Sequence, residues 1–177
     1  MGINFPDGTQ SYPTTTIQTK QHLYSTVESY SGASSSTWQD ITTATITARS
    51  SSSKLLAYIE VHGYNGTSGM DRLFGAQIAV GNGSFTSFGN NPNTFTNMNE
   101  AFVSNCRGDD HDKGYNQTML FLIDNNWSDG NDLHIKLRTV GESTFYLNQG
   151  SQTDTGSARF GRGRTRIILR EEIGEPS

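Results

Sequence analysis

The sequence is poor in cysteine, in charged residues and in long apolar runs. A single thiol, Cys106, stands among 177 residues, which excludes an internal disulfide framework and leaves a hydrophobic core to stabilise the fold. Asp, Glu, Lys and Arg make up 17% of the chain, against about 25% in an average soluble protein. No run approaches the roughly 18 apolar residues of a membrane span, and the N-terminus lacks a signal-peptide pattern. We therefore expect synthesis in a cytoplasm and no membrane insertion.

The polar residues that are present favour strands and turns over helices. Ser and Thr together number 41, Asn 14 and Gly 19, whereas helical surfaces are normally coated with Glu, Lys, Ala and Gln. Thr suits exposed strands, while Ser, Asn and Gly suit turns and caps. The net charge of −4 argues against a protein that binds nucleic acid through its overall charge.

Alternation of apolar and polar residues predicts several strands. The clearest segments are Lys54–Tyr64, Leu133–Val140 and Arg164–Ile173, in which every second residue would face a core. Met119–Ile123 is continuously apolar, which predicts a central strand with both faces covered. Further strands are expected at Thr16–Ser25, Thr43–Ala48, Leu73–Val80, Thr94–Val103 and Phe145–Asn148.

Clusters of Gly, Asn, Ser and Pro separate these segments and supply the backbone conformations of tight turns. No segment has a convincing 3.6-residue apolar period, so the fold class is all-β. Many short strands at this spacing predict an antiparallel β-sandwich, jelly-roll-like, of about eight or nine strands. We expect one domain over residues 14–173, after an extended N-terminal arm of residues 1–13 and before a frayed C-terminus of residues 174–177.

The N-terminal arm has too little apolar surface to fold alone, yet it contains Ile3, Phe5 and Tyr12. Apolar side chains would be wasteful in a fully solvated tail. One interpretation is that the arm docks on a neighbouring subunit through these three residues. The alternative is that the arm packs against its own domain.

Four segments spread along the chain carry a family resemblance. They are Ile3–Gln10 (INFPDGTQ), Trp38–Ile41 (WQDI), Ser50–Leu56 (SSSSKLL) and Thr165–Ile173 (TRIILREEI). Together they resemble a family of small virion proteins, common in phages of marine and freshwater cyanobacteria and often described as tail-fibre or structural proteins. The resemblance implies a β-sandwich, expected to be trimeric, attached to a tail fibre, baseplate or capsid, and it implies no catalytic residues.

Two acidic segments are candidates for metal sites. Asp109–Asp112 is rich in carboxylates and includes a histidine, a set that suits calcium, magnesium or a transition metal. Adjacent residues of one loop rarely point the same way, so a solvated loop is favoured. Asp124–Asp132 has oxygen ligands at alternate positions, but its glycine falls one place late for a calcium loop. We interpret it as a hairpin loop with an exposed Trp127, and we expect no metal and no cofactor.

Five of the 13 basic residues lie between Arg159 and Arg170. The Gly-Arg pattern is one that single-stranded nucleic acids bind. The spacing of Arg164, Arg166 and Arg170 also matches the outer face of a strand, and arginine suits ion pairs across subunit interfaces. The subunit interface is the favoured interpretation over nucleic acid.

Aromatic and acidic residues are candidates for sugar-binding and catalytic groups. Tyr64 and Trp127 could stack on a host-surface glycan if both rings were exposed, although such residues are more often packing residues. Glu60, Asp71 and Glu100 could converge in space and supply the paired carboxylates of a glycosidase. The four histidines accompany no nucleophile signature, so we expect no enzymatic activity.

The sequence thus predicts a non-enzymatic structural protein of a bacteriophage virion, made in the host cytoplasm and assembled on the outside of the particle. It would form or decorate a tail fibre or another receptor-facing appendage. Its partners would be further copies of itself, as a trimer, and other virion proteins. The alternatives are a capsid decoration or cement protein, a stand-alone carbohydrate-binding module and, least favoured, a glycan-cleaving enzyme.

Overall fold

The computed structural model describes most of the expected sandwich. The described residues are 3–4, 10–11, 15–32, 37–66, 71–87, 104–107, 115–124, 126–141, 143–149 and 163–173; of residues 3, 4, 10, 11, 71, 87, 104–107 and 115 only the backbone is described. These residues form strands and no helix. The strands are β1 (Ile3–Asn4), β2 (Gln10–Ser11), β3 (Thr15–Tyr24), β4 (Glu28–Tyr30), β5 (Gln39–Thr47), β6 (Ser53–Asn65), β7 (Asp71–Val80), β8 (Thr86–Ser87), β9 (Ser104–Arg107), β10 (Tyr115–Ile123), β11 (Asp132–Gly141), β12 (Phe145–Leu147) and β13 (Thr165–Ile173).

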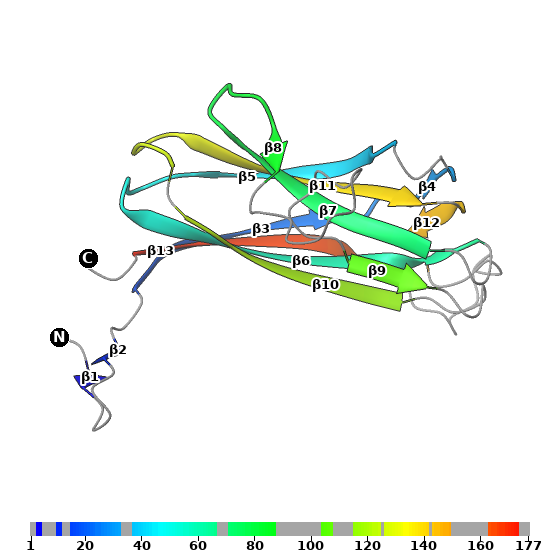
Figure 1. Ribbon diagram of the computed structural model, residues 1–177, viewed down its shortest axis with the longest axis horizontal. Helices are drawn as coiled ribbons and strands as arrows, with labels where there is room; N and C mark the ends of the chain where they lie inside the picture. Colours follow the sequence, from blue (N-terminus) through cyan, green and yellow to red (C-terminus); the bar gives the residue numbers. More distant parts are fainter. Residues whose placement is uncertain are drawn as a thin grey trace, which may run out of the picture.

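The long strands form two antiparallel sheets that pack face to face (Figure 1). In the first, called sheet I, β6 pairs with β10 on one side and with β13 and then β12 on the other. β3 and β4 extend sheet I beyond β13 and β12. In sheet II, β11 lies between β5 and β7, and β8 and β9 pair with the far side of β7.

The strand order supports the predicted architecture. Eight described strands have four or more residues; numbered 1 to 8 along the chain, they run 1-8-3-6 in sheet I and 2-7-4-5 in sheet II. The antiparallel β-sandwich is therefore confirmed. The jelly-roll-like winding stays a prediction, which this strand order favours.

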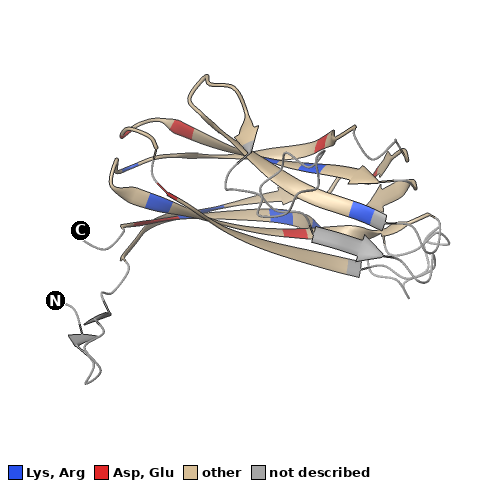
Figure 2. Cartoon of the chain, viewed as in Figure 1, with Lys and Arg blue, Asp and Glu red and all other residues tan. Residues whose placement is uncertain are grey.

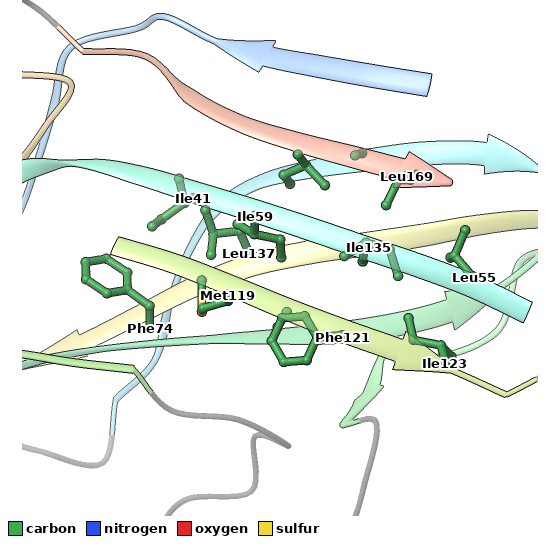
Figure 3. Packing of buried hydrophobic residues seen from close by; sticks show 14 of the residues in the cluster. Ile41, Leu55, Ile59, Phe74, Met119, Phe121, Ile123, Ile135, Leu137 and Leu169 are labelled. Atoms are coloured by element: carbon green, nitrogen blue, oxygen red, sulfur yellow. The ribbon is translucent and has the colours of Figure 1, made fainter. Parts of the chain in front are cut away.

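The core lies between the sheets and follows the predicted alternation (Figure 3). On β6, the odd-numbered residues from Leu55 to Val61 have no exposed surface, whereas the even-numbered ones are partly exposed. β11 and β13 show the same pattern, with Leu133, Ile135 and Ile167 fully buried. Burial of each such side chain stabilises the fold by roughly 1.5–3 kcal/mol, so the inward rows fix which face of each strand meets the core.

One strand prediction is wrong in its placement. Met119–Ile123 belongs to β10, which among the described strands pairs with β6 alone and so lies at the edge of the described part of sheet I. Met119, Phe121 and Ile123 are buried, but Leu120 and Leu122 are each 61% exposed. A continuous apolar run does not show whether both faces of a strand are buried or only one. The packing and pairing of the strand in the folded protein decide this.

The loop from Asp124 to Asp132 also differs from its prediction. The sequence predicts that it closes a hairpin, but it leads from β10 in sheet I to β11 in sheet II. The loop therefore crosses the end of the sandwich. The predicted strand Thr94–Val103 lies outside the described residues, as do residues 174–177. β1 and β2 pair with each other and with no other described strand.

Along one edge of β6, pairing with β12 ends and pairing with β13 begins. Asn148 joins the strands at this junction. The Asn148 amide donates to the carbonyls of Tyr24 and Thr26, both at 2.8 Å. Its oxygen accepts from the Thr165 amide at 2.7 Å and from the Thr165 hydroxyl at 2.9 Å. Its backbone amide donates to His62 O at 2.8 Å. The residue is buried with φ of 59°, in the left-handed region that asparagine tolerates better than most residues.

A buried carboxylate closes the opposite end of sheet I. Glu171 has no exposed surface and accepts hydrogen bonds from the Ser53 hydroxyl at 2.6 Å, from Gln18 Nε2 at 2.5 Å and from the amides of Arg49 and Ser50 at 2.9 and 3.1 Å. Burial opposes ionisation, but these donors outweigh it and hold the pKa of Glu171 below its usual value. The carboxylate thus ties β3, β6 and β13 to the turn after β5.

Replacing Asn148 tests the junction. We expect Asn148→Ala to lower the free energy of unfolding by about 3 kcal/mol or more, because several buried polar groups lose their partners. Asn148→Gly loses the same bonds but tolerates the positive φ, so it should be about 1 kcal/mol more stable than the alanine variant. Urea unfolding measures both values. Equal stability of all three proteins would contradict the assignment.

The Glu171 carboxylate predicts a pH dependence of stability. Its pKa is lower in the folded state, so the unfolded state takes up a proton first as the pH falls. The contribution of Glu171 is therefore complete at neutral pH and is lost as the pH falls below the ordinary glutamate pKa of about 4.3. We expect Glu171→Gln to be less stable by about 2 kcal/mol at neutral pH, with the difference narrowing in acid. A difference that is constant with pH, measured by denaturant unfolding, would argue against this role.

Candidate functional site

The outer face of sheet I carries a row of apolar side chains. Tyr58 on β6 lies between Ile168 on β13 and Leu120 on β10, and in the next outward row Leu56 lies beside Leu122. These five residues are called the apolar patch. Four of them, Leu56, Tyr58, Leu120 and Ile168, line an open depression of about 350 Å³ together with two arginines. With Leu120 and Leu122 mostly exposed, the patch is the kind of surface that another protein covers.

Ion pairs border the patch at both ends. Arg166 pairs with Glu60 in the row above Tyr58, and this hydrogen bond raises the pKa of the arginine. At the other end, Arg170 lies beside Leu56, and its Nη2 is 2.6 Å from Glu172 Oε1. Lys54 Nζ lies 3.1 Å from Asp124 Oδ1 at the same end. Apolar side chains framed by charges of both signs resemble the core and rim of a protein–protein interface.

On sheet II, by contrast, the outward side chains of β5 and of the first part of β11 are polar. Asp40 accepts from Lys136 Nζ at 2.9 Å and from Arg138 Nε at 2.7 Å. Burial opposes ionisation of Asp40, but these two cations outweigh it and lower the pKa of the carboxyl. His134 Nδ1 forms a 2.8 Å hydrogen bond with Thr45 on the neighbouring strand. Figure 2 shows that basic and acidic residues are interspersed on the strands, so charges of one sign do not gather on one sheet.

The two residues predicted as glycan contacts, Tyr64 and Trp127, are both buried, against the exposure that this role requires. Tyr64 is 2% exposed and stacks on Tyr146, with ring centroids 4.7 Å apart. Trp127 is 8% exposed, and its indole N–H donates to Ser50 O at 3.2 Å. The expected exposed tryptophan is buried because its loop crosses between sheets and packs against the turn before β6. Neither ring offers a free face for a sugar.

The arginines predicted at a subunit interface point outward. Arg164 is exposed just before β13, while Arg166 and Arg170 lie on the outer face of sheet I beside the apolar patch. Arg166 and Arg170 already pair with acidic residues of their own chain. For the predicted docking arm, Ile3 is described by its backbone in β1 alone, and Phe5 and Tyr12 lie outside the described residues.

A group of titratable side chains surrounds Glu28. The Tyr24 hydroxyl donates to its carboxylate at 2.6 Å, and the Tyr30 hydroxyl donates to the other oxygen. Burial and the hydrogen bond to Glu28 raise the pKa of Tyr30 far above its usual range. A phenol that holds its proton this firmly serves as a hydrogen-bond donor, and the group joins β3 to β4.

Two of the three candidate acids, Glu60 and Asp71, lie apart. Glu60 lies on the outer face of sheet I and pairs with Arg166, pointing away from sheet II, which contains Asp71 on β7. Glu100 and the acidic segment Asp109–Asp112 lie outside the described residues. In the part of the chain that is described, no three His, Cys, Asp or Glu residues gather in a geometry that could hold a metal ion.

Sequence reasoning missed the apolar patch, although its signal was present. Leu56 and Tyr58 occupy the outward row of β6, and Leu120 and Leu122 occupy the second row of an apolar strand. The continuous apolar run of β10 predicts that both faces of the strand are covered, so Leu120 and Leu122 were expected to be buried. Only the pairing of β10 with β6 brings the two rows together on one surface.

Comparisons with models of known protein families and with curated proteins give no match. None of the described segments forms a helix with the length and apolar character needed to span a membrane.

The burial of Trp127 predicts a structural effect of its substitution. Trp127→Phe removes an N–H that donates to Ser50 O and should lower the free energy of unfolding by about 1–2 kcal/mol. Trp38→Phe is the matched control, because Trp38 Nε1 has no acceptor among the described residues; we expect a smaller change there. Denaturant unfolding followed by the remaining tryptophan's fluorescence compares the two. A larger loss for Trp38→Phe would contradict the assigned hydrogen bond.

Proposed function

We propose that this chain is a non-enzymatic structural protein of a bacteriophage virion that forms or decorates an external appendage as a homo-oligomer. The virion assignment rests on the resemblance of INFPDGTQ, WQDI, SSSSKLL and TRIILREEI to small cyanophage structural proteins. The single structural observation in its support is the apolar patch on the outer face of sheet I. The trimer that the resemblance implies stays a prediction.

The two outer faces are stable in different surroundings. An apolar surface framed by ion pairs gains free energy when another protein covers it. An outer face rich in hydrogen-bonded Thr, His and Asp side chains, as in Thr45, His134 and Asp40, is stable in contact with water. A module with one face of each kind suits a position on the surface of an assembly, where one side contacts protein and the other contacts solvent.

A capsid cement protein would use the same surface against a lattice, and we retain it as the alternative within this class. The carbohydrate-binding module loses its specific support, because the rings of Tyr64 and Trp127 are buried. Appendage and cement roles differ in where the protein lies on the particle, so a test must locate it.

Purified phage particles test the proposal. We expect quantitative mass spectrometry of gradient-purified particles to find the chain in several copies per particle, with a reference virion protein as the internal standard. Immunogold labelling should then place it on a tail or fibre. Labelling spread over the head would replace the appendage role with the cement role. Absence from purified particles, with the chain present in the lysate, would overturn the virion assignment.

A further inference from the structure

We propose that the outer face of sheet I binds the same face of a second copy of the chain. The two copies would be related by a twofold axis that crosses the strands at the level of Ala57, Phe121 and Leu169. This inference rests on the homo-oligomer in the proposed function and names the surface that forms it. It follows from the pattern of side chains across β13, β6 and β10.

This rotation places charged residues of one copy opposite residues of the other sign in the second copy. The three central residues are neighbours in the sheet, since Ala57 pairs with both Phe121 and Leu169. Rotation about an axis through them reverses the strand direction and keeps each strand opposite its own copy. Glu60 then faces Lys54 of the second copy, and Arg166 faces Glu172, because each pair lies three residues on either side of the axis. Opposite charges therefore meet at both ends of the interface.

The same rotation brings apolar residues together. Tyr58 faces Leu56 of the second copy, and Leu120 faces Leu122, each pair lying one residue on either side of the axis. Leu120 and Leu122 are the most exposed of the large hydrophobic residues in the described part of the chain. Because the contact is isologous, the two leucines of both copies are buried in it.

A second twofold arrangement is less favourable. An axis parallel to the strands, between β6 and β13, also places opposite charges together, because Glu60 then faces Arg166. It places β10 opposite β3, however, so that Leu120 and Leu122 meet the polar residues Gln21 and Thr19. The axis across the strands places Glu60 opposite Lys54 and Arg166 opposite Glu172 and also brings the leucines together, while Arg170 faces Ile168.

The outer face of sheet I is large enough for a stable dimer only if the whole face is buried in the contact. Sheet I is four strands wide, and β10 and β13 have nine residues each. At about 4.8 Å between strands and about 3.3 Å per residue, the face measures about 19 by 30 Å, or about 570 Å² in projection. Side-chain relief adds to this area, and a standard interface buries about 800 Å² per partner. Only a full-face contact therefore approaches the standard area. Such a contact closes as a pair, so a trimer would require a different surface.

The test uses the full chain and its mass in solution. Sedimentation equilibrium should give twice 19.4 kDa for the natural protein. Leu120→Ser with Leu122→Ser should weaken association about tenfold or more, while thermal unfolding confirms the fold. Val27→Ser is the matched control, because Val27 is an exposed apolar residue between β3 and β4, away from the patch. A monomer at every concentration, or association unaffected by the leucine changes, would overturn the proposal.

A charge exchange tests the register. Lys54→Glu places a second carboxylate opposite Glu60 of the other copy, and Glu60→Lys places two lysines opposite each other, so each variant alone should associate weakly. A mixture of the two should recover association, because each new charge then meets its opposite. Weak association in the mixture would overturn the axis across the strands. Under the axis parallel to the strands, the carboxylate introduced by Lys54→Glu would face Glu172 of either partner, so the mixture would also associate weakly. A chain that is monomeric but present in phage particles would refute this inference and leave the virion role in place.

Discussion

The structure depends on the burial of one row of β6. This strand pairs on both sides along most of its length, with β10 on one edge and with β13 and β12 on the other. Because side chains alternate along a strand, the burial of Leu55, Ala57 and Ile59 forces Leu56 and Tyr58 to the outer face. The same constraint that builds the core therefore displays the apolar patch.

Buried polar groups hold the sandwich together where regular pairing ends. Asn148 lies where β12 and β13 follow one another along β6, and it supplies partners to backbone groups that the interrupted ladder leaves free. Glu171 does the same for the amides of Arg49 and Ser50 at the other end. Buried backbone groups without partners are costly, so these two side chains determine how the ends of sheet I are closed.

The two outer faces of the sandwich differ, since sheet I presents the apolar patch and sheet II presents polar side chains on β5 and β11. An edge strand with exposed apolar residues is an aggregation hazard unless something covers it. On β10, the outward leucines lie beside Tyr58 and Leu56 and within reach of Arg166 and Arg170. A defined partner would turn this hazard into an interface, and the balanced charges on the face favour an identical partner.

The sequence alone determined the fold class and most strands. Alternation in Lys54–Tyr64, Leu133–Val140 and Arg164–Ile173 was sufficient to assign strands and inward rows, because a period of two is a local property of the chain. Tertiary structure decided which strands lie at an edge, which loops cross between sheets and which aromatic rings are buried. It exposed Leu120 and buried Trp127, against both predictions. The physical reason is that strand pairing joins residues far apart in the chain, and no local pattern records which neighbour will cover a given face.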